Sequence, residues 1–279
     1  MPAALVTGAG RGTGLEIARR LVGRGYEVAV TDVDQALTSS AAEQLGDRAW
    51  PLRLDVTEAE AVDAAASEVI RRSGSLDVWV NNAGILITGL AHEQPVDAYR
   101  RHLEVNYLGT VHGTLAAIER MRAGGRGHII NLISLAGLAA APGIVAYSAS
   151  KHAAIAFSLG TAADLRRAGL GGIRISCVCP DGVWTPMVND KLDDPNDALS
   201  FSGVMLMPEQ VAERVEGLLD KPKAVLAIPG WRGRFARFLD RHPGLSLRLT
   251  PLLMRDAQRR QRAFKGKVES GKWPPPEYR

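Results

Sequence analysis

One stretch near the N-terminus decides the fold: Ala3-Ala-Leu-Val-Thr-Gly8-Ala-Gly-Arg11-Gly12-Thr-Gly14. An apolar run leads straight into a glycine-rich turn, and a pattern of helical period follows. Glycines at a strand-to-helix turn let the backbone approach a pyrophosphate, and the helix N-terminus offers unpaired N–H groups and the positive end of a dipole. The stretch therefore predicts a βα unit that binds a dinucleotide at Gly8, Gly12 and Gly14.

The same rhythm of short apolar runs and longer helical patterns continues along the chain. Seven runs are candidate strands, and they are rich in Val, Ile and Leu without strict alternation, which is typical of a parallel sheet covered on both faces. They are residues 3–7, 27–32, 50–55, 76–81, 127–133, 173–178 and 224–229. We therefore expect residues 1–230 to form one doubly wound α/β domain, a Rossmann fold with a seven-stranded parallel sheet.

Composition limits the class of protein. With 46% apolar and 23% charged residues, the 279-residue chain can bury a good core, which excludes a disordered or collagen-like chain. Cys177 and Cys179 are two residues apart in an apolar run, so we expect buried free thiols in a reducing compartment. We recognise no secretory signal and expect a cytoplasmic protein. Aromatic residues are only 5% of the chain, which argues against a nucleic-acid groove.

Charge is divided unevenly along the chain. The net charge of +4 combines a net of +9 in residues 231–279 with a net of −5 in residues 1–230. Apolar residues at helical spacing, then an apolar run over 245–254, precede a basic run over 255–272. We expect a basic, partly helical C-terminal extension that is frayed at its end. It either makes a peripheral contact with anionic lipid or packs over the substrate cleft or a partner subunit.

Asp32 ends the second apolar run, 18 residues after Gly14. Its carboxylate can accept hydrogen bonds from an adenosine ribose and would repel a 2′-phosphate, which favours NAD over NADP. Two other interpretations compete with this one. Asp32 or Asp34 could cap the helix that follows, and Arg11 in the glycine turn could pair with a 2′-phosphate.

Further motifs follow in order along the chain. Asn81-Asn82-Ala83-Gly84 follows the fourth run, Asn106 lies in Val-Asn-Tyr-Leu-Gly, Ser134 ends Asn-Leu-Ile-Ser, and Tyr147-Ser-Ala-Ser-Lys151 comes 13 residues later. With the glycine turn, they resemble the motifs of the short-chain dehydrogenase/reductase family, in its shorter single-domain form, over residues 3–188. The resemblance implies an NAD(P)-dependent oxidoreductase acting on an alcohol or carbonyl group. No metal is expected, because none of the six histidines has ligand spacing.

Tyr147 and Lys151 are four residues apart, so they share one face of a helix. We expect Lys151 and the positive ring of an oxidised nicotinamide to lower the pKa of the phenol. The resemblance implies that Tyr147 exchanges a proton with the substrate oxygen, to which Ser134 hydrogen-bonds, and that Lys151 also holds the nicotinamide ribose. It implies that Asn106 anchors a water that relays the proton outward past Lys151.

The resemblance also implies contacts farther along the cofactor. Asp55 would lie beside the adenine, although it is also a fair helix cap, and Val183 and Thr185 would contact the carboxamide. Asp181 stands where the family has glycine, so either Gly182 takes over the flexibility or a carboxylate faces the cofactor. The expected cofactor-binding residues are Gly8, Arg11, Gly12, Gly14, Asp32, Asp55, Asn82, Ala83, Gly84, Tyr147, Lys151, Pro180, Val183 and Thr185.

Residues 188–207 occupy the position of the family's substrate lid. The apolar residues at its end favour a lipophilic substrate, unless they pack the lid onto its own core. They are Phe201, Val204, Met205, Leu206 and Met207. We expect an NAD(H)-dependent oxidoreductase that interconverts a secondary alcohol and a ketone, as a homodimer or homotetramer. The alternatives are an NADPH-dependent carbonyl reductase of the 3-oxoacyl type, which Arg11 would favour, and a non-catalytic nucleotide-binding regulatory protein.

Overall fold

The computed structural model describes residues 1–274 and contains a seven-stranded parallel sheet. The strands are β1 (Ala3–Val6), β2 (Glu27–Asp32), β3 (Ala49–Arg53), β4 (Val78–Asn81), β5 (Gly127–Leu132), β6 (Ile173–Pro180) and β7 (Val225–Ile228). Their order across the sheet is β3-β2-β1-β4-β5-β6-β7. This confirms the predicted doubly wound fold, with strand ends displaced by at most two residues.

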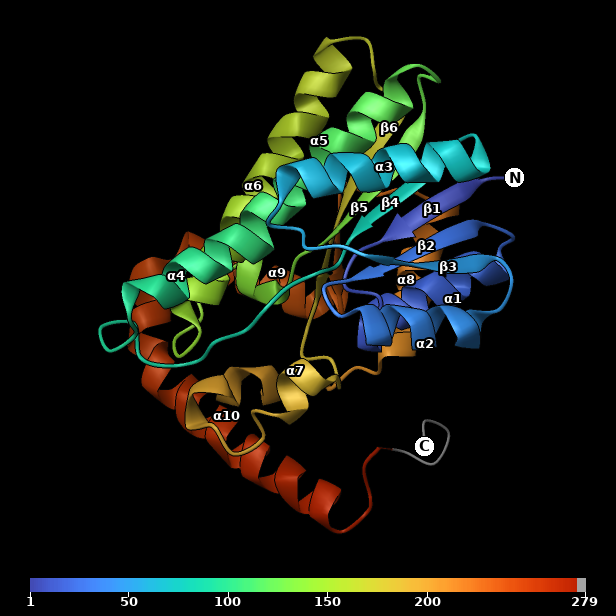
Figure 1. Cartoon of the computed structure of the whole chain (residues 1–279). Helices are drawn as coiled ribbons and strands as arrows, with labels where there is room; N and C mark the ends of the chain where they lie inside the picture. Colours follow the sequence, from blue (N-terminus) through green and yellow to red (C-terminus); the bar gives the residue numbers. More distant parts are fainter. Residues whose placement is uncertain (275–279) are drawn as a thin grey trace.

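Helices cover both faces of the sheet (Figure 1). One apolar core joins the sheet to α1 (Gly12–Gly23), α2 (Gln35–Leu45) and α8 (Pro208–Asp220). A second core on the opposite face joins it to α3 (Ala59–Ser73), α5 (Gly109–Arg122) and α6 (Val145–Arg167). Because both faces are buried, the strands are apolar throughout and do not alternate.

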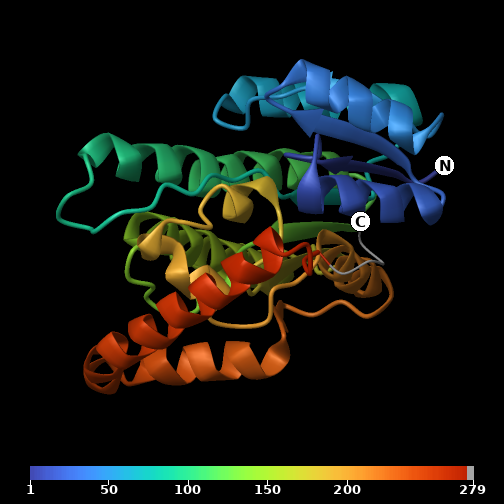
Figure 2. The same ribbon diagram turned by 90° about the horizontal axis from the view of Figure 1, so that it is seen from below.

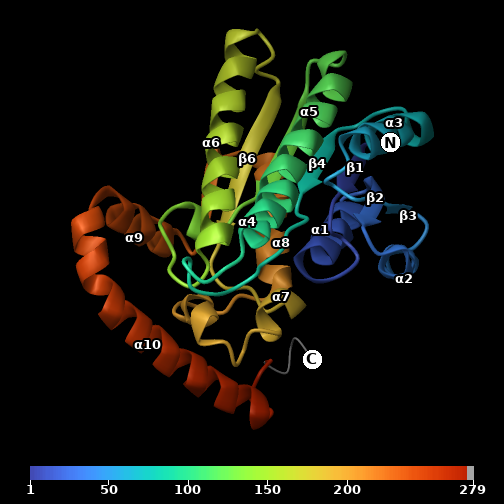
Figure 3. The ribbon, with the colours of Figure 1, turned by 60° about the vertical axis from the view of Figure 1, so that its left-hand side comes forward.

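The chain order reverses at the pair β1 and β4, and this reversal leaves a crevice at the carboxyl ends of the strands. Short segments surround that edge. α4 (Val96–His102) and the π-helix η1 (Leu103–Leu108) lead into α5, and the 3₁₀ turn η2 (Leu135–Gly137) follows β5. α7 (Pro186–Asn189) and the 3₁₀-helix η3 (Pro195–Phe201) overlap residues 188–207, the segment expected to act as a substrate lid and called the lid region below (Figure 3).

The C-terminal extension is two consecutive helices, α9 (Gly230–Arg241) and α10 (Pro243–Glu269). Pro243 occupies the first turn of α10, where its missing N–H costs no hydrogen bond. α9 packs beside β7, and α10 crosses the lid region along η3 (Figure 2). The predicted helical extension is confirmed, whereas the fraying expected over 275–279 lies outside the described residues.

Candidate active site

A cavity of about 1330 Å³ opens at the carboxyl ends of the strands. Its walls come from the glycine turn, the ends of β2 to β6, the start of α6, the lid region and the helices α9 and α10. Of the predicted site residues, all but Gly14 and Asn106 line it. Residues separated by more than 200 positions in the sequence therefore meet around one space.

The glycine turn has the backbone that the sequence predicts. Gly8 and Gly12 both have positive φ, 60° and 59°. A Cβ on Gly14 would stand 2.3 Å from the carbonyl oxygen of Gly8, so only glycine lets the helix begin so close to the strand. The Asn82 amide braces this turn by donating to the carbonyls of Thr7 and Gly8, each at 2.9 Å.

The competing interpretations of Asp32 are separated by the helix that follows it. The N-cap of α2 is Asp34, whose carboxylate accepts hydrogen bonds from the N–H groups of Ala36 and Leu37. Asp32 is not the cap. Its carboxylate lies at the cavity wall and accepts bonds only at 3.3 Å, from the N–H groups of Gly10 and Asp34. Acceptor capacity for a ligand is therefore left at Asp32.

Asp55 is not the cap of the helix that follows it, although the sequence allowed that role. One of its oxygens accepts from the N–H and the hydroxyl of Thr57, at 2.9 and 2.7 Å, in a local turn. The N-cap of α3 is Glu58. Asp55 therefore shapes the loop at the cavity wall. Arg11, the N-cap of α1, is exposed and also lines the cavity.

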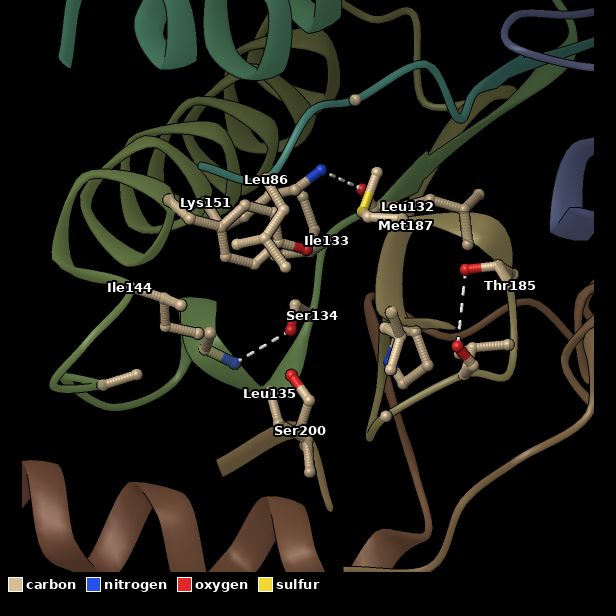
Figure 4. Close-up of a pocket in the computed structure, with 18 of the residues that line it drawn as sticks. Leu86, Leu132, Ile133, Ser134, Leu135, Ile144, Lys151, Thr185, Met187 and Ser200 are labelled. Carbon is tan, nitrogen blue, oxygen red and sulfur yellow. Dashed lines mark hydrogen bonds between the residues drawn. The ribbon is translucent and has the colours of Figure 1, made fainter. Parts of the chain in front are cut away.

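Ser134, Tyr147 and Lys151 line the same cavity, and Figure 4 shows Ser134 and Lys151 there. Ser134 ends the loop after β5, and its Oγ accepts a hydrogen bond from the N–H of Ala136 at 3.1 Å. Tyr147 and Lys151 lie one turn apart on α6, and the Lys151 Nζ is 5.7 Å from the centre of the Tyr147 ring. Lys151 also donates to the carbonyl of Leu132 at 2.9 Å.

Burial is the main influence of the protein on the pKa values of Tyr147 and Lys151. It raises the pKa of Tyr147 to about 12, although a hydrogen bond with Ser134 acts in the opposite direction. Burial lowers the pKa of Lys151 to about 8. The sequence led us to expect that Lys151 and an oxidised nicotinamide lower the phenol pKa. Within the protein, desolvation outweighs the hydrogen bond with Ser134, and the nearby Asp197 and Cys179 also raise the pKa.

Asn106 lies in the π-helical turn η1, completely buried. Its amide oxygen accepts from the N–H of Ile85 at 2.8 Å, and its NH₂ donates to the Ile85 carbonyl and to the Ser150 hydroxyl, both at 3.1 Å. A Cβ on the neighbouring Gly84 would stand 3.2 Å from this amide oxygen and 3.7 Å from the Lys151 Nζ. The side chain of Asn106 therefore fixes the loop after β4 beside Lys151.

The Asp181 side chain is held by an ion pair, whereas the sequence left open whether its carboxylate faces the cofactor or Gly182 takes over the flexibility of the turn. The buried carboxylate of Asp181 pairs with Arg232 of α9, with the Arg232 Nε 2.9 Å from Oδ2. Arg232 also donates to the Ser202 hydroxyl at 2.8 Å, so one guanidinium joins the loop after β6, the lid region and the extension. Gly182 is required for space, because a Cβ there would stand 2.0 Å from the Ser200 carbonyl oxygen.

The apolar end of the lid region contributes less to the cavity than the sequence suggested. Phe201 packs against Phe264 of α10, and Leu206 and Met207 are buried. Among the five apolar residues singled out there, only Val204 lines the cavity. The apolar wall is built mainly by residues outside the lid region, including Leu86, Leu135, Ile144 and Met187, together with Leu199 of η3.

The extension supplies the wall that the sequence left open. Trp231, Phe235 and Leu239 of α9 line the cavity, as do Thr250, Leu253 and Met254 of α10. α10 is tied to the lid region: the Gln261 amide donates to the carbonyls of Lys191 and Asp194, at 3.2 and 2.8 Å. The packing of the extension over the cleft, one of the two alternatives, is therefore present.

Two further residues were not found from the sequence. His102 is buried at the end of α4, with its ring centre 6.3 Å from that of Tyr147, and burial lowers its pKa. Arg232 holds Asp181 from 51 residues away. Neither position carries a local pattern that marks it. A basic residue near the start of α9 was visible, but its partner was not.

Residues 1–274 show neither a metal-binding cluster nor a membrane-spanning helix. No three His, Cys, Asp or Glu side chains come together there in a way that could hold a metal ion. No helix in the same range is both long and apolar enough to span a bilayer.

Comparisons with known proteins agree with this geometry. The family model described as short chain dehydrogenase matches residues 2–196. The chain is 34% identical to 3-beta-hydroxysteroid dehydrogenase of Comamonas testosteroni over 80% of this chain and 91% of that protein. It is 37% identical to 2-(R)-hydroxypropyl-CoM dehydrogenase of Xanthobacter autotrophicus over 69% of this chain and 78% of that protein.

A solved structure is also similar. A short chain dehydrogenase/reductase from Burkholderia phymatum in complex with NAD superposes with a TM-score of 0.79, at 25% identity, over 88% of this chain and 95% of the other. Fold, motif order and relatives thus agree. The chain belongs to the short-chain dehydrogenase family and is an oxidoreductase that uses a nicotinamide cofactor to interconvert an alcohol and a carbonyl group.

Proposed function

We propose that this enzyme transfers a hydride between NAD(H) and a lipophilic secondary alcohol or its ketone. One observation carries the proposal: Ser134, Tyr147 and Lys151 meet at the cavity wall where the glycine turn, Gly84 and an apolar pocket adjoin. The hydroxysteroid dehydrogenase among the relatives acts, by its name, on an apolar secondary alcohol, which supports the same class.

The residues of the glycine turn fit a dinucleotide. Positive φ at Gly8 and Gly12 and the absence of side chains keep the backbone open at the N-terminus of α1, which favours a pyrophosphate there. Ala83 and Gly84 follow β4, Pro180 ends β6, and Val183 and Thr185 follow it; all five line the cavity. These residues would hold the cofactor, which supplies or accepts the hydride when bound.

Proton transfer is the task of the chain's own side chains. In the reduction direction, the Tyr147 hydroxyl donates its proton to the substrate oxygen, and a pKa of about 12 keeps that proton in place near neutral pH. Ser134 holds the same oxygen by a hydrogen bond. Lys151 stabilises the phenolate that remains. We propose that Asn106, which fixes the loop after β4, anchors the water that relays the proton outward past Lys151.

NAD is favoured over NADP by Asp32. Asp34 takes the role of helix cap, so the Asp32 carboxylate remains an acceptor at the cavity wall for ribose hydroxyls. Arg11 favours the NADPH-dependent alternative, because its guanidinium could pair with a 2′-phosphate. It lies in the same wall and forms no ion pair with any residue in 1–274.

A lipophilic substrate is supported by the cavity rather than by the lid region. Three aliphatic side chains, Leu86, Leu135 and Ile144, surround Ser134 (Figure 4). The helices α9 and α10 close the far side with Trp231, Phe235, Leu239, Leu253 and Met254. Binding of an apolar substrate there would be stabilised by about 25 cal/mol for each Å² of apolar surface removed from water.

Our proposal also covers the oligomeric state, the cellular location and the domain limits. We propose a homodimer formed through the outer faces of α5 and α6, where Leu115 and Leu159 are exposed, with Leu108 of η1 exposed just before α5. Buried free thiols at Cys177 and Cys179 support a cytoplasmic location. We propose the division at Gly230, with 1–230 as the catalytic domain, 188–207 as its lid and 231–279 as the extension.

The experiment that tests this function is turnover of apolar secondary alcohols with NAD, followed by NADH absorbance, in the wild type and in Tyr147→Phe. We expect kcat/KM to fall at least 100-fold in the variant, because it lacks the acid and base, while NADH affinity changes by no more than a few fold. Tyr107→Phe, away from the cavity, is the matched control. Equal turnover in Tyr147→Phe and wild type would remove Tyr147 as the proton donor, and NADH binding without any turnover would favour a regulatory protein.

A further inference from the structure

The two faces of α10 differ in composition. The face toward the lid region carries Ser246, Thr250, Leu253, Ala257, Gln261 and Phe264, which are buried or half-buried. The opposite face alternates leucine with arginine at helical spacing. Its exposed residues are Leu245, Arg248, Leu252, Arg255, Arg259 and Arg262. Packing over the cleft therefore uses only one side of the helix.

The outer face of α9 has the same character. Its buried side, with Gly233 and Leu239, packs toward β7. Its exposed side carries three aromatic residues, Trp231, Phe235 and Phe238, of which Trp231 is 54% and Phe238 48% exposed. Arg234, Arg237 and Arg241 are exposed beside them. Single exposed apolar residues are ordinary, but a row of aromatics next to a row of arginines is not.

Positive charge dominates this flank. We define the outer flank as the exposed residues of α9 and of residues 243–262 in α10 that lie away from the cleft and the lid region. The exposed acidic residues of the same stretch are Asp240 and Asp256, and Asp256 pairs with Arg260. Seven of its arginines, at positions 234, 237, 241, 248, 255, 259 and 262, form no ion pair within residues 1–274. By contrast, Arg232, Arg260 and Lys265, which lie nearer the cleft or the lid region, each pair with an aspartate.

The outer flank also borders the cavity. Trp231 and Phe235 line the cavity and are at the same time 54% and 39% exposed, so they form its rim. Leu252, on the outer flank, is adjacent in sequence to Leu253, which lines the cavity. An apolar molecule that leaves the outer flank would enter the cavity past these aromatic side chains.

We propose that the outer flank docks on an anionic lipid bilayer and that the cavity receives its apolar substrate from that surface. Exposed aromatic and leucine side chains among unpaired arginines match the requirements of an interfacial helix, whose apolar side chains enter the headgroup boundary while its cations bind lipid phosphates. The straight length of α10 is about 40 Å at 1.5 Å per residue, enough to contact many lipids. The route for the substrate rests on the proposed function, whereas docking itself does not.

The test uses the full-length protein and vesicles of phosphatidylglycerol with phosphatidylcholine, compared with vesicles of phosphatidylcholine alone. We expect co-sedimentation with the anionic vesicles at about 20 mM salt and at least tenfold weaker binding at about 150 mM, since screening acts within about 8–10 Å. Binding to phosphatidylcholine alone should be at least tenfold weaker than to the anionic vesicles.

Two triple variants with the same change in charge make the comparison sharp. Arg248→Glu, Arg255→Glu and Arg259→Glu together alter the outer flank without touching a residue that lines the cavity. Arg126→Glu, Arg166→Glu and Arg174→Glu alter exposed arginines without ion pairs around the amino ends of β5 and β6, away from the cavity. We expect the first variant to lose vesicle binding by about 100-fold or more, at roughly fivefold for each basic residue, and the second by less than fivefold.

Turnover of a water-soluble alcohol separates this proposal from the proposed function. Both triple variants should keep wild-type kcat and KM for it, and anionic vesicles should accelerate turnover only of a substrate partitioned into the bilayer. No vesicle binding at low salt, or an equal loss in both triple variants, would overturn docking whatever the activity. Low-salt self-association abolished by the first variant in the absence of vesicles would identify a second copy as the occupant instead. Docking without vesicle acceleration would overturn only the route.

Discussion

Asp181 and Arg232 form a buried ion pair, 2.9 Å between Oδ2 and Nε, that connects the loop after β6 to the C-terminal extension. The same guanidinium reaches Ser202 in the lid region. The loop after β6, the lid region and α9 therefore share one charged contact, and disturbing it should affect all three.

We expect Arg232→Met to lower the free energy of unfolding by about 3–5 kcal/mol, because it leaves the Asp181 carboxylate buried without a partner. Chemical denaturation measures this, and KM for the cofactor should rise with it. Arg167→Met is the matched control, since its pair with Asp164 is exposed at 3.4 Å and such pairs contribute about 0–1 kcal/mol. Removing both charges, with Asp181→Asn added, should recover part of the loss. An unaltered denaturation midpoint in Arg232→Met would contradict this account of the pair.

Cofactor preference should depend on Asp32. The wild type should bind NADH more tightly than NADPH, because a carboxylate repels a 2′-phosphate, and Asp32→Ala should narrow or reverse the difference and leave Arg11 free to pair with that phosphate. Fluorescence titration with both reduced cofactors measures the two affinities. Asp34→Ala is the control, because Asp34 also lines the cavity but its carboxylate caps α2, whereas the Asp32 carboxylate stays in place. A wild-type preference for NADPH would support the alternative reductase.

Asp197 in the lid region should make stability depend on pH. Burial raises its pKa from 3.8 to about 7, so between these values the folded protein holds a proton that the unfolded chain has released. Its contribution to the free energy of unfolding therefore falls as pH rises through this window and is constant above it. At about 1.4 kcal/mol per pKa unit, the upper limit is on the order of 4 kcal/mol.

The effect of Asp197 is isolated by comparison with Asp197→Asn. His128 contributes with the opposite sign, because burial lowers its pKa to about 4 and the unfolded chain holds more protons below its normal value. We therefore compare the free energy of urea unfolding at pH 5 and pH 8. From pH 5 to pH 8 it should fall more in the wild type than in the variant, in which only His128 and the other groups titrate. The same change in both proteins would mean that Asp197 does not titrate in this window.

The proposed dimer should depend on α5 and α6. Leu115→Glu with Leu159→Glu places charges on two exposed apolar positions, 53% and 38% exposed, and should convert the dimer to a monomer in analytical ultracentrifugation. Leu247→Glu, at a 74% exposed position on α10, is the control and should leave the dimer intact. A dimer that survives in the double variant would place the interface elsewhere.

Local patterns predicted most of the fold and most of the candidate site. The strand at residues 27–32 was predicted to the residue, because its apolar run is bounded by a glycine turn and an acidic cap. Tyr147 and Lys151 share a helix, so their spacing alone brings them together. By contrast, the partners of Asp181 and the role of Phe201 depend on α9 and α10, and the direction of the Tyr147 pKa depends on how completely the surrounding segments exclude water. Such long-range contacts leave no periodic signal in a single sequence.

The crossing of α10 over the lid region has a consequence for biosynthesis. Trp184 packs against Phe264 and Trp273, with ring centres 5.4 and 6.1 Å apart, so the loop after β6 is completed by residues that the ribosome adds some 80 to 90 positions later. Domains fold largely from the N-terminus during translation, so a nascent chain can form the sheet and the glycine turn while the cleft still lacks one side. For a time this nascent enzyme has an uncovered apolar cleft, and a chaperone that binds apolar surface would meet it there first.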